Sequence, residues 1–130
     1  MQLNNLFSID KPFSSNRKEE KKHGDSGSLI GSPLSGEGLI VDDVISSGSS
    51  IEESINIIKK NNAKPISVLV ALDRMELGKE RRAAFELESD NNISVHSIIN
   101  IEDVVVYLKK NGSGNDNIQR MEEYLDQFKR

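Results

Sequence analysis

Residues 39–50 read LIVDDVISSGSS, and this stretch predicts how the chain folds. Residues 39–41 form a short apolar run typical of a buried strand, and the carboxylates Asp42 and Asp43 follow at once. Small residues then lead directly into a helical pattern. Because ligands of open parallel sheets bind at the carboxyl ends of the strands, this stretch predicts a binding site as well as a strand.

Strands and helices are expected to alternate downstream of this stretch. A helix over residues 49–62 would carry Ile51, Ile55 and Ile58 on one face, and Ser49 with Glu52 or Ser50 with Glu53 would form a capping box at its start. The pattern next predicts a strand over 66–72, a helix over 80–90 with Ala84 and Leu87 inward, a strand over 93–99, a helix over 101–110, and a final helix with Ile118, Met121, Leu125 and Phe128 on one face. This alternation predicts an α/β fold with a mostly parallel, Rossmann-like sheet flanked by helices.

Composition limits the class of protein. A chain of 130 residues is an ordinary length for one domain, so residues 1–130 are expected to form a single unit. It has no cysteine, which rules out disulfides and thiolate metal sites and fits a cytoplasmic protein. A net charge of −4 argues against nucleic acid as the main partner. No apolar run is long enough to span a membrane and no secretory signal is present, so no membrane partner is expected.

The loop after the strand has the features of an anion site. Residues 46–50 are small enough for backbone N–H groups to converge on an anion, and the helix that follows adds partial positive charge. Asp42 and Asp43 would repel a bare phosphate, but they could accept hydrogen bonds from hydroxyls beside it, which points to a phosphorylated ribose. The alternative is a solvated strand end with a helix-capping serine cluster, and spacing alone does not separate the two.

This stretch resembles the phosphoribosyl-diphosphate signature of type I phosphoribosyltransferases. The resemblance implies that Asp42 and Asp43 bind the ribose 2′- and 3′-hydroxyls and that residues 46–50 hold the 5′-phosphate. The family usually has threonine at two loop positions where this chain has serine, which keeps the hydroxyl. The substrate-binding stretch thus comprises Asp42, Asp43, Val44, Ile45, Ser46, Ser47, Gly48, Ser49 and Ser50.

A basic segment, NRKEEKKHG at residues 16–24, carries a second match. Taken alone it is typical of a solvated charge run with Lys/Glu pairs. It also resembles the mobile catalytic loop of orotate phosphoribosyltransferases, and this implies that Arg17, Lys18, Lys21 and His23 contact the diphosphate. Residues 13–35 would then be the mobile loop region, residues 1–12 a divergent start, and residues 36–130 the α/β core. In that family the loop completes the site of the neighbouring subunit, which implies a homodimer.

A third match is ALDRME at residues 71–76. Its ordinary interpretation is a salt-bridged strand terminus. It is similar to the Leu-Asp-Arg-Gln-Glu of orotate phosphoribosyltransferases, which implies that Arg74 pairs with the orotate carboxylate, while Ser46 reaches the pyrimidine. A guanidinium fork suits a planar carboxylate. His96 lies mid-strand and is interpreted as structural.

Together the three matches imply an orotate phosphoribosyltransferase of pyrimidine nucleotide synthesis. Lys21, His23, Asp42 and Asp43 are the expected catalytic residues, and Mg²⁺ would be held mainly by the substrate diphosphate rather than by a protein metal site. Members of the family are longer at the N-terminus, so the sequence is expected to be a truncated frame, a fragment of a split protein or a short relative.

Two other functions compete with this one. The first is a catalytically inactive module that binds a phosphoribosyl ligand. The second is a receiver-like signalling domain, which also carries paired aspartates at a strand end. A receiver-like domain would need a lysine at a later strand terminus, and residues 93–100 contain none.

Overall fold

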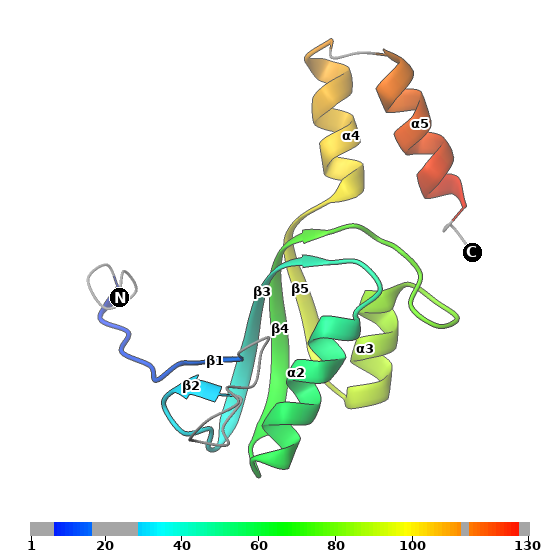
Figure 1. The fold of residues 1–130 in the computed structure, drawn as a ribbon. Helices are drawn as coiled ribbons and strands as arrows, with labels where there is room; N and C mark the ends of the chain where they lie inside the picture. The colour runs from blue at the N-terminus through cyan, green and yellow to red at the C-terminus, as the bar shows by residue number, and fades with distance from the viewer. Residues whose placement is uncertain (1–6, 17–28, 113–114, 128–130) are drawn as a thin grey trace, which may run out of the picture.

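A computed structural model describes residues 7–16, 29–112 and 115–127. Within them, a small β-hairpin precedes a parallel sheet, and two helices follow it (Figure 1). The sheet contains β3 (Glu37–Ile45), β4 (Lys64–Asp73) and β5 (Ser94–Asn100), all parallel and in that order. The predicted α/β class with a parallel sheet is confirmed.

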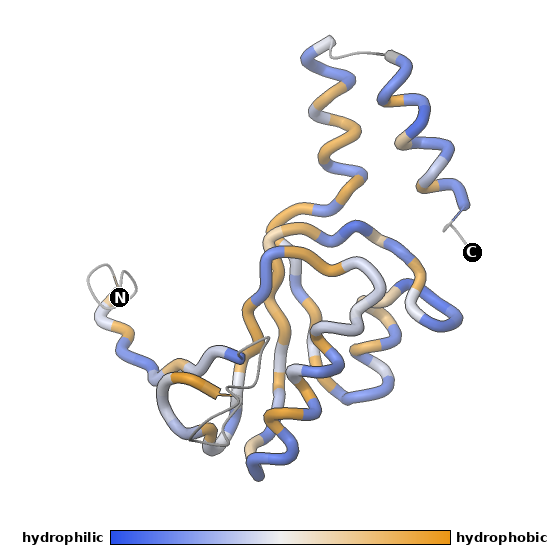
Figure 2. The backbone as a smooth tube through the Cα atoms, viewed as in Figure 1, coloured by the Kyte–Doolittle hydropathy of each residue, from blue (hydrophilic) through white to orange (hydrophobic). Residues whose placement is uncertain are grey.

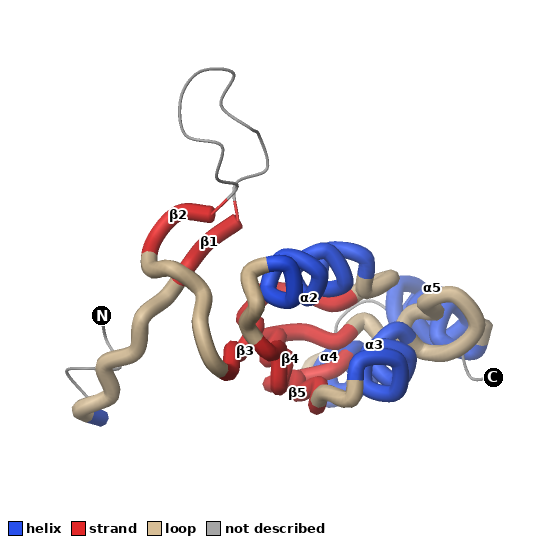
Figure 3. The backbone as a smooth tube through the Cα atoms, turned by 90° about the horizontal axis from the view of Figure 1, so that it is seen from below, coloured by secondary structure: helices blue, strands red, loops and turns tan. Residues whose placement is uncertain are grey.

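Two helices connect the strands across one face of the sheet. α2 (Ser49–Lys60) joins β3 to β4, and α3 (Ala83–Asn91) joins β4 to β5. Figures 1 and 3 show both helices on the same side of the sheet. Strands that are neighbours in sequence are therefore neighbours in space, as is usual for successive βαβ units.

The main core lies between the sheet and these two helices. Its sheet side is formed by alternate residues of the strands, and its helix side includes the predicted isoleucine face of α2 and Leu87 of α3, while Ala84 packs against it half-buried. The buried members are Ile40, Ile45, Ile51, Ile55, Ile58, Val68, Val70, Ala83, Leu87 and Ile93. Several of these are completely removed from water, as close packing of branched side chains requires.

The opposite face of the sheet is open among the described residues. Leu39 and Val41 of β3 are 54% and 69% exposed, and Ile98 of β5 is 73% exposed. Figure 2 shows hydrophobic residues along the strands. His96, interpreted as structural, pairs with Leu69 in the ladder and is exposed in the middle of β5. Parallel sheets are normally covered on both faces, so this open apolar face is unusual.

The hairpin of β1 (Ser14–Asn16) and β2 (Leu29–Gly31) was not expected from the sequence. Each strand has only three residues, too few to show alternation. The Ser14 hydroxyl donates to the carbonyl of Ser32, and the Ser32 N–H donates to the carbonyl of Phe13 at 2.9 Å. Asn16 pairs with Leu29 in this hairpin, and residues 17–28 lie outside the described part.

The last two helices pack on each other rather than on the sheet core. α4 (Ile101–Lys110) begins at a capping box in which Asn100 and Asp103 exchange side-chain-to-backbone hydrogen bonds of 3.0 and 2.9 Å. α5 (Asn115–Asp126) follows a short connection. Val105, Ile118 and Leu125 form their shared core, with Met121 half-buried against it. The predicted inward face of α5 is thus confirmed, apart from Phe128, which lies outside the described residues.

Three boundary details differ from the sequence prediction. β3 continues to Ile45, so the two aspartates lie within the strand rather than after it. α3 begins at Ala83 because residues 79–81 fold onto the Glu86 side chain instead of joining the helix. Neither predicted capping box at the start of α2 forms, since its N-cap is Gly48 and no side chain caps it.

The open face predicts that two similar substitutions in neighbouring strands differ in how much stability they cost. Val41→Lys should change the free energy of unfolding by no more than about 0.5 kcal/mol, as for other exposed sites. Val68→Lys should cost roughly 3 kcal/mol or more, because Val68 is fully buried and the charge would have no partner there. Urea unfolding measures both. Equal losses would show that the face carrying Val41 is covered.

Candidate functional site

The candidate site begins at the carboxyl end of β3, where the two aspartates lie side by side in the strand. Neighbouring strand residues point to opposite faces, and the two carboxylates differ accordingly. Asp42 is half-buried and its Oδ2 accepts a 3.3 Å hydrogen bond from Ser50 in the first turn of α2. Its Oδ1 accepts a 3.0 Å hydrogen bond from the backbone N–H of Asp43. Asp43 itself is exposed.

The turn between β3 and α2 depends on Gly48. Its φ of 82° lies in the left-handed region, where a residue without Cβ is favoured. A Cβ at this position would also lie 3.2 Å from Leu87 Cδ1 and 3.5 Å from Ala83 Cβ, so α3 packs directly against the turn. Gly48 is buried, and its carbonyl accepts the first helical hydrogen bond from Glu52 at 2.9 Å.

The start of α2 presents hydroxyls and backbone N–H groups with no side-chain cap. The Ser47 and Ser49 hydroxyls lie 3.2 Å apart, and both residues are exposed. The first N–H groups of a helix lack partners inside the helix, and they carry partial positive charge. The turn can therefore accept an anion, with the Asp42 carboxylate beside it on the strand.

Arg74 lies next to this turn because β4 runs parallel to β3. Its backbone N–H donates to the carbonyl of Ile45, the last residue of β3, at 3.0 Å. Its Nη2 forms a 2.5 Å ion pair with Glu76 Oε1, and 47% of the Arg74 side chain is exposed. The structure thus brings together the strand end, the serine turn and Arg74. Arg17, Lys18, Lys21 and His23 lie outside the described residues.

A second turn, on the β4–α3 connection, binds an anion that is part of the protein, the side-chain carboxylate of Glu86. The Glu86 carboxylate accepts backbone hydrogen bonds from Lys79, Glu80 and Arg81 at 2.7, 2.6 and 2.7 Å. These three donors lower the pKa of Glu86 to about 2. Lys79 also reaches Glu52 of α2 at 3.0 Å, and this contact raises the pKa of Lys79. The connection is therefore fixed to both helices beside the site.

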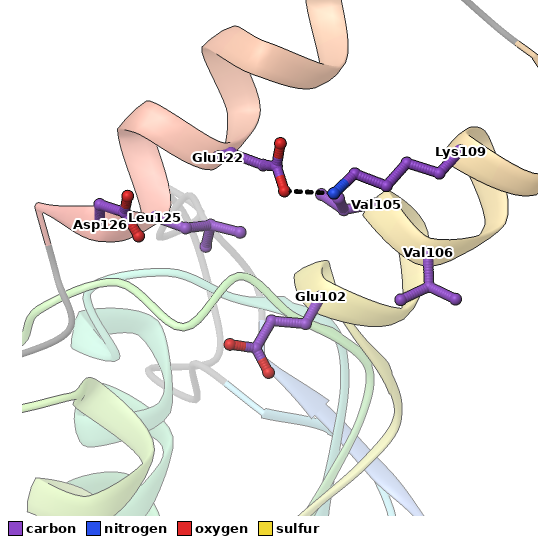
Figure 4. A pocket seen from close by; sticks show the side chains of 7 residues that line it. All are labelled: Glu102, Val105, Val106, Lys109, Glu122, Leu125 and Asp126. Carbon is purple, nitrogen blue, oxygen red and sulfur yellow. Dashed lines mark hydrogen bonds and ion pairs between the residues drawn. The ribbon is translucent and has the colours of Figure 1, made fainter.

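A separate pocket lies between the C-terminal helices (Figure 4). Figure 4 shows Lys109 of α4 pairing with Glu122 of α5 across it. Its lining is Glu102, Val105, Val106, Lys109, Glu122, Leu125 and Asp126. None of these residues was predicted to bind a ligand.

Two further properties concern metals and membranes. Among the described residues, no group of three or more His, Cys, Asp or Glu side chains could hold a metal ion. The carboxylates of Asp42 and Asp43 are nonetheless hard oxygen donors of the kind that Mg²⁺ accepts together with substrate phosphates. In the same part of the chain, no helix has the length and apolar character needed to cross a membrane.

Comparison with known proteins agrees with this geometry. Residues 5–106 match the family described as the phosphoribosyl transferase domain, which covers most of the chain. The chain belongs to the phosphoribosyltransferase family. The loop and strand that carry the candidate site lie inside the matched region.

Curated relatives of this phosphoribosyltransferase chain are named orotate phosphoribosyltransferase, in agreement with the resemblance seen in the sequence. One from Hahella chejuensis is 45% identical over 123 residues, which is 94% of this chain and 57% of the relative. One from Marinobacter nauticus is 47% identical over 119 residues, covering 91% of this chain and 56% of the relative. The chain therefore spans somewhat more than half the length of the curated relatives that it matches.

Solved structures that resemble this chain are also named orotate phosphoribosyltransferase. A crystal structure of orotate phosphoribosyltransferase from Francisella tularensis is 29% identical, with a TM-score of 0.73. It matches 96% of this chain and 59% of its own. One from Aeropyrum pernix is 30% identical, with a TM-score of 0.64. The type I phosphoribosyltransferase fold expected from the sequence is confirmed.

The salt-bridged strand terminus that is the ordinary interpretation of residues 71–76 is present, because Arg74 pairs with Glu76. Sequence reasoning missed one residue that contacts this pair. Tyr124 of α5 was not singled out, although its hydroxyl donates to Glu76 at 2.8 Å. The spacing of Arg74 and Glu76 offered a signal for the first contact. The contact with Tyr124 joins residues 48 positions apart and left no local signal.

Gly48 predicts a stability difference between two glycine substitutions. Gly36 also has a positive φ, of 66°, but a Cβ there would meet no atom within 4 Å. Gly36→Ala should therefore cost only the backbone penalty of about 1 kcal/mol. Gly48→Ala should cost more, roughly 2–3 kcal/mol, because the new methyl also presses on Leu87. Urea unfolding midpoints compare the two, and equal losses would refute the close packing of α3 on the turn.

Glu86 predicts a pH dependence of stability. Its pKa is lowered to about 2 in the folded chain from an ordinary value of 4.5, so its contribution is fully present above pH 4.5 and is lost as the pH falls towards 2. Glu86→Gln should thus melt below the wild-type temperature at pH 7, and the gap should narrow between pH 4.5 and 2. Thermal melts across this range measure the gap. A gap that stays constant would contradict the assignment.

Proposed function

We propose that this chain carries the phosphoribosyl-diphosphate site of an orotate phosphoribosyltransferase. The reaction would transfer a phosphoribosyl group from phosphoribosyl diphosphate to orotate, giving orotidine 5′-phosphate and diphosphate in pyrimidine nucleotide synthesis. The observation that carries the proposal is the uncapped turn between β3 and α2, with a left-handed Gly48 and Asp42 facing Ser50. The relatives' shared name supports the choice of orotate.

The β3 end and the turn would bind the phosphorylated ribose. Asp42 and Asp43 would accept hydrogen bonds from the 2′- and 3′-hydroxyls. Residues 46–50 would surround the 5′-phosphate with backbone N–H groups and serine hydroxyls, at the positive end of the α2 dipole. Asp42 already accepts a hydroxyl hydrogen bond from Ser50, which shows the kind of contact that a ribose hydroxyl would replace or share.

The chemical step would break the bond between the anomeric carbon and the diphosphate oxygen and form one to a ring nitrogen of orotate, which loses its proton. The electron pair of the broken bond leaves on the diphosphate, so negative charge grows there as the sugar becomes oxocarbenium-like. Cations at the leaving group would stabilise the transition state more than the ground state. By family resemblance these are Arg17, Lys18, Lys21 and His23. Mg²⁺, when bound to the diphosphate, would supply further positive charge.

Orotate would be held by its carboxylate at Arg74. The backbone N–H of Arg74 bonds to the carbonyl of Ile45 at the carboxyl end of β3, and almost half of the Arg74 side chain is exposed. A guanidinium can bind a carboxylate through two parallel hydrogen bonds. Ser46, half-buried at the start of the turn, would contact the pyrimidine.

The proposal includes an assembly. By the same resemblance, the enzyme would be a cytoplasmic homodimer in which the basic loop of one subunit acts on the site of the other. Residues 17–28 lie in the sequence between β1 and β2, and the resemblance implies that they form the loop that closes over the bound ligand. Closure would exclude water from the reactive sugar.

The alternative to an enzyme is an inactive module that binds phosphoribosyl ligands. Retention of the basic loop favours the enzyme, because a protein that only binds the ligand has little need of cations at the leaving group.

Orotate consumption with phosphoribosyl diphosphate and Mg²⁺ tests the proposal. We expect turnover by the purified chain and a loss of at least about 100-fold in an Asp42→Asn, Asp43→Asn variant, since two charge-assisted hydrogen bonds would be weakened. Binding of phosphoribosyl diphosphate without turnover would identify the inactive module. A chain that neither binds nor reacts, or a variant with full turnover, would contradict both the ligand and the roles given to the aspartates.

A further inference from the structure

Three side chains from two distant parts of the chain meet beside the site. The Glu76 Oε1 atom pairs with Arg74 Nη2 at 2.5 Å and accepts a hydrogen bond from the Tyr124 hydroxyl at 2.8 Å. Arg74 and Glu76 follow β4, whereas Tyr124 belongs to α5. Only 16% of the Glu76 side chain is exposed, compared with 47% for Arg74. A largely buried carboxylate therefore holds a partly exposed cation.

The backbone around Glu76 is fixed independently of this contact. Met75 has a φ of 56°, is buried, and donates its N–H to Asp73 Oδ1 at 2.7 Å. The Glu76 carbonyl accepts a 2.9 Å hydrogen bond from the N–H of Ala83, at the start of α3. Arg74 is fixed by its own backbone bond to Ile45. The backbones of Arg74 and Glu76 are thus both held by hydrogen bonds that do not involve the ion pair.

An exposed Arg–Glu pair usually contributes little, because both side chains are mobile and well solvated. The pair here differs in two respects. Its carboxylate is mostly removed from water, and a third residue holds that carboxylate from a separate helix. The hydrogen bond to Glu76, followed by burial, raises the pKa of Tyr124, as expected when a phenol donates to a charged carboxylate.

We infer that Glu76 and Tyr124 are positioning residues that orient the Arg74 guanidinium towards the carboxylate of the pyrimidine substrate. The inference rests on the proposed function, in which Arg74 binds orotate. An arginine that is already oriented loses less side-chain freedom when its ligand arrives, so the ligand binds more tightly. Glu76 engages Nη2, and the guanidinium carries further donors for a substrate.

The test compares orotate affinity among four variants by calorimetry, on the full chain in the presence of Mg²⁺. Glu76→Ala should weaken orotate binding about tenfold, because it removes the carboxylate that pairs with Arg74. Tyr124→Phe should weaken it about threefold, because it removes only the hydrogen bond to that carboxylate. Glu76→Gln keeps an oxygen acceptor and should fall between Glu76→Ala and wild type. Tyr107→Phe is the matched control, since Tyr107 is 65% exposed on α4, and it should bind as wild type.

Phosphoribosyl diphosphate affinity separates positioning from general damage. It should stay unchanged in every variant, and in turnover assays the KM for orotate should rise more than kcat falls. A Glu76→Ala variant with wild-type orotate affinity, alongside an Arg74→Ala variant that has lost it, would overturn the inference alone. Wild-type affinity in Arg74→Ala would instead overturn the role that the proposed function gives to Arg74, and the inference with it.

A ligand-free measurement tests the contact itself. With Tyr107 replaced by Phe, phenol absorbance during an alkaline titration reports Tyr124, whose pKa should lie above its ordinary value of 10.0. Glu76→Ala in this background should lower that pKa towards 10.0, and Arg74→Ala should raise it, because the arginine opposes the shift. An unchanged titration in Glu76→Ala would overturn the inference even in a chain that binds no orotate.

Discussion

The close contact between Gly48 and α3 is the constraint on which the rest of the site depends. α3 approaches the turn so closely that a methyl group at residue 48 would press on Leu87, and the turn itself needs a left-handed residue there. The same contact fixes where α2 begins, because the Gly48 carbonyl accepts the first helical hydrogen bond. The direction of the α2 dipole and the positions of the serine hydroxyls follow from that one packed glycine.

Much of the fold could be predicted because its elements carry local patterns. The isoleucine face of α2 has the period of a helix, and β4 is a short apolar run; the structure places the α2 face and Val68 and Val70 of β4 in the core. The capping boxes expected at Ser49 and Ser50 did not form, because a left-handed glycine one position earlier had already started the helix. The helix expected from residue 80 starts at Ala83, because Glu86 draws the preceding N–H groups onto its own carboxylate.

The candidate site was predictable to the extent that it is continuous in sequence. Asp42 and the serine turn lie together in the chain, and the structure keeps them together. Arg74 could be named only through a family motif, because its place beside Ile45 depends on the register of β3 and β4. Tyr124 could not have been found at all, since nothing in residues 115–127 indicates which side chain reaches back to the β4 end. The roles of the basic residues at 17–23 stay predictions.

The order of the strands also determines when the site can form during synthesis. Because β3, β4 and β5 are neighbours in the same order as in the chain, each strand can pair as soon as it has left the ribosome, without waiting for a distant partner. The turn that would hold the phosphate can therefore be complete once α3 has emerged. Tyr124 is translated later than every other residue of the described site, so in a nascent chain the turn between β3 and α2 can form before Tyr124 is available to bond to Glu76.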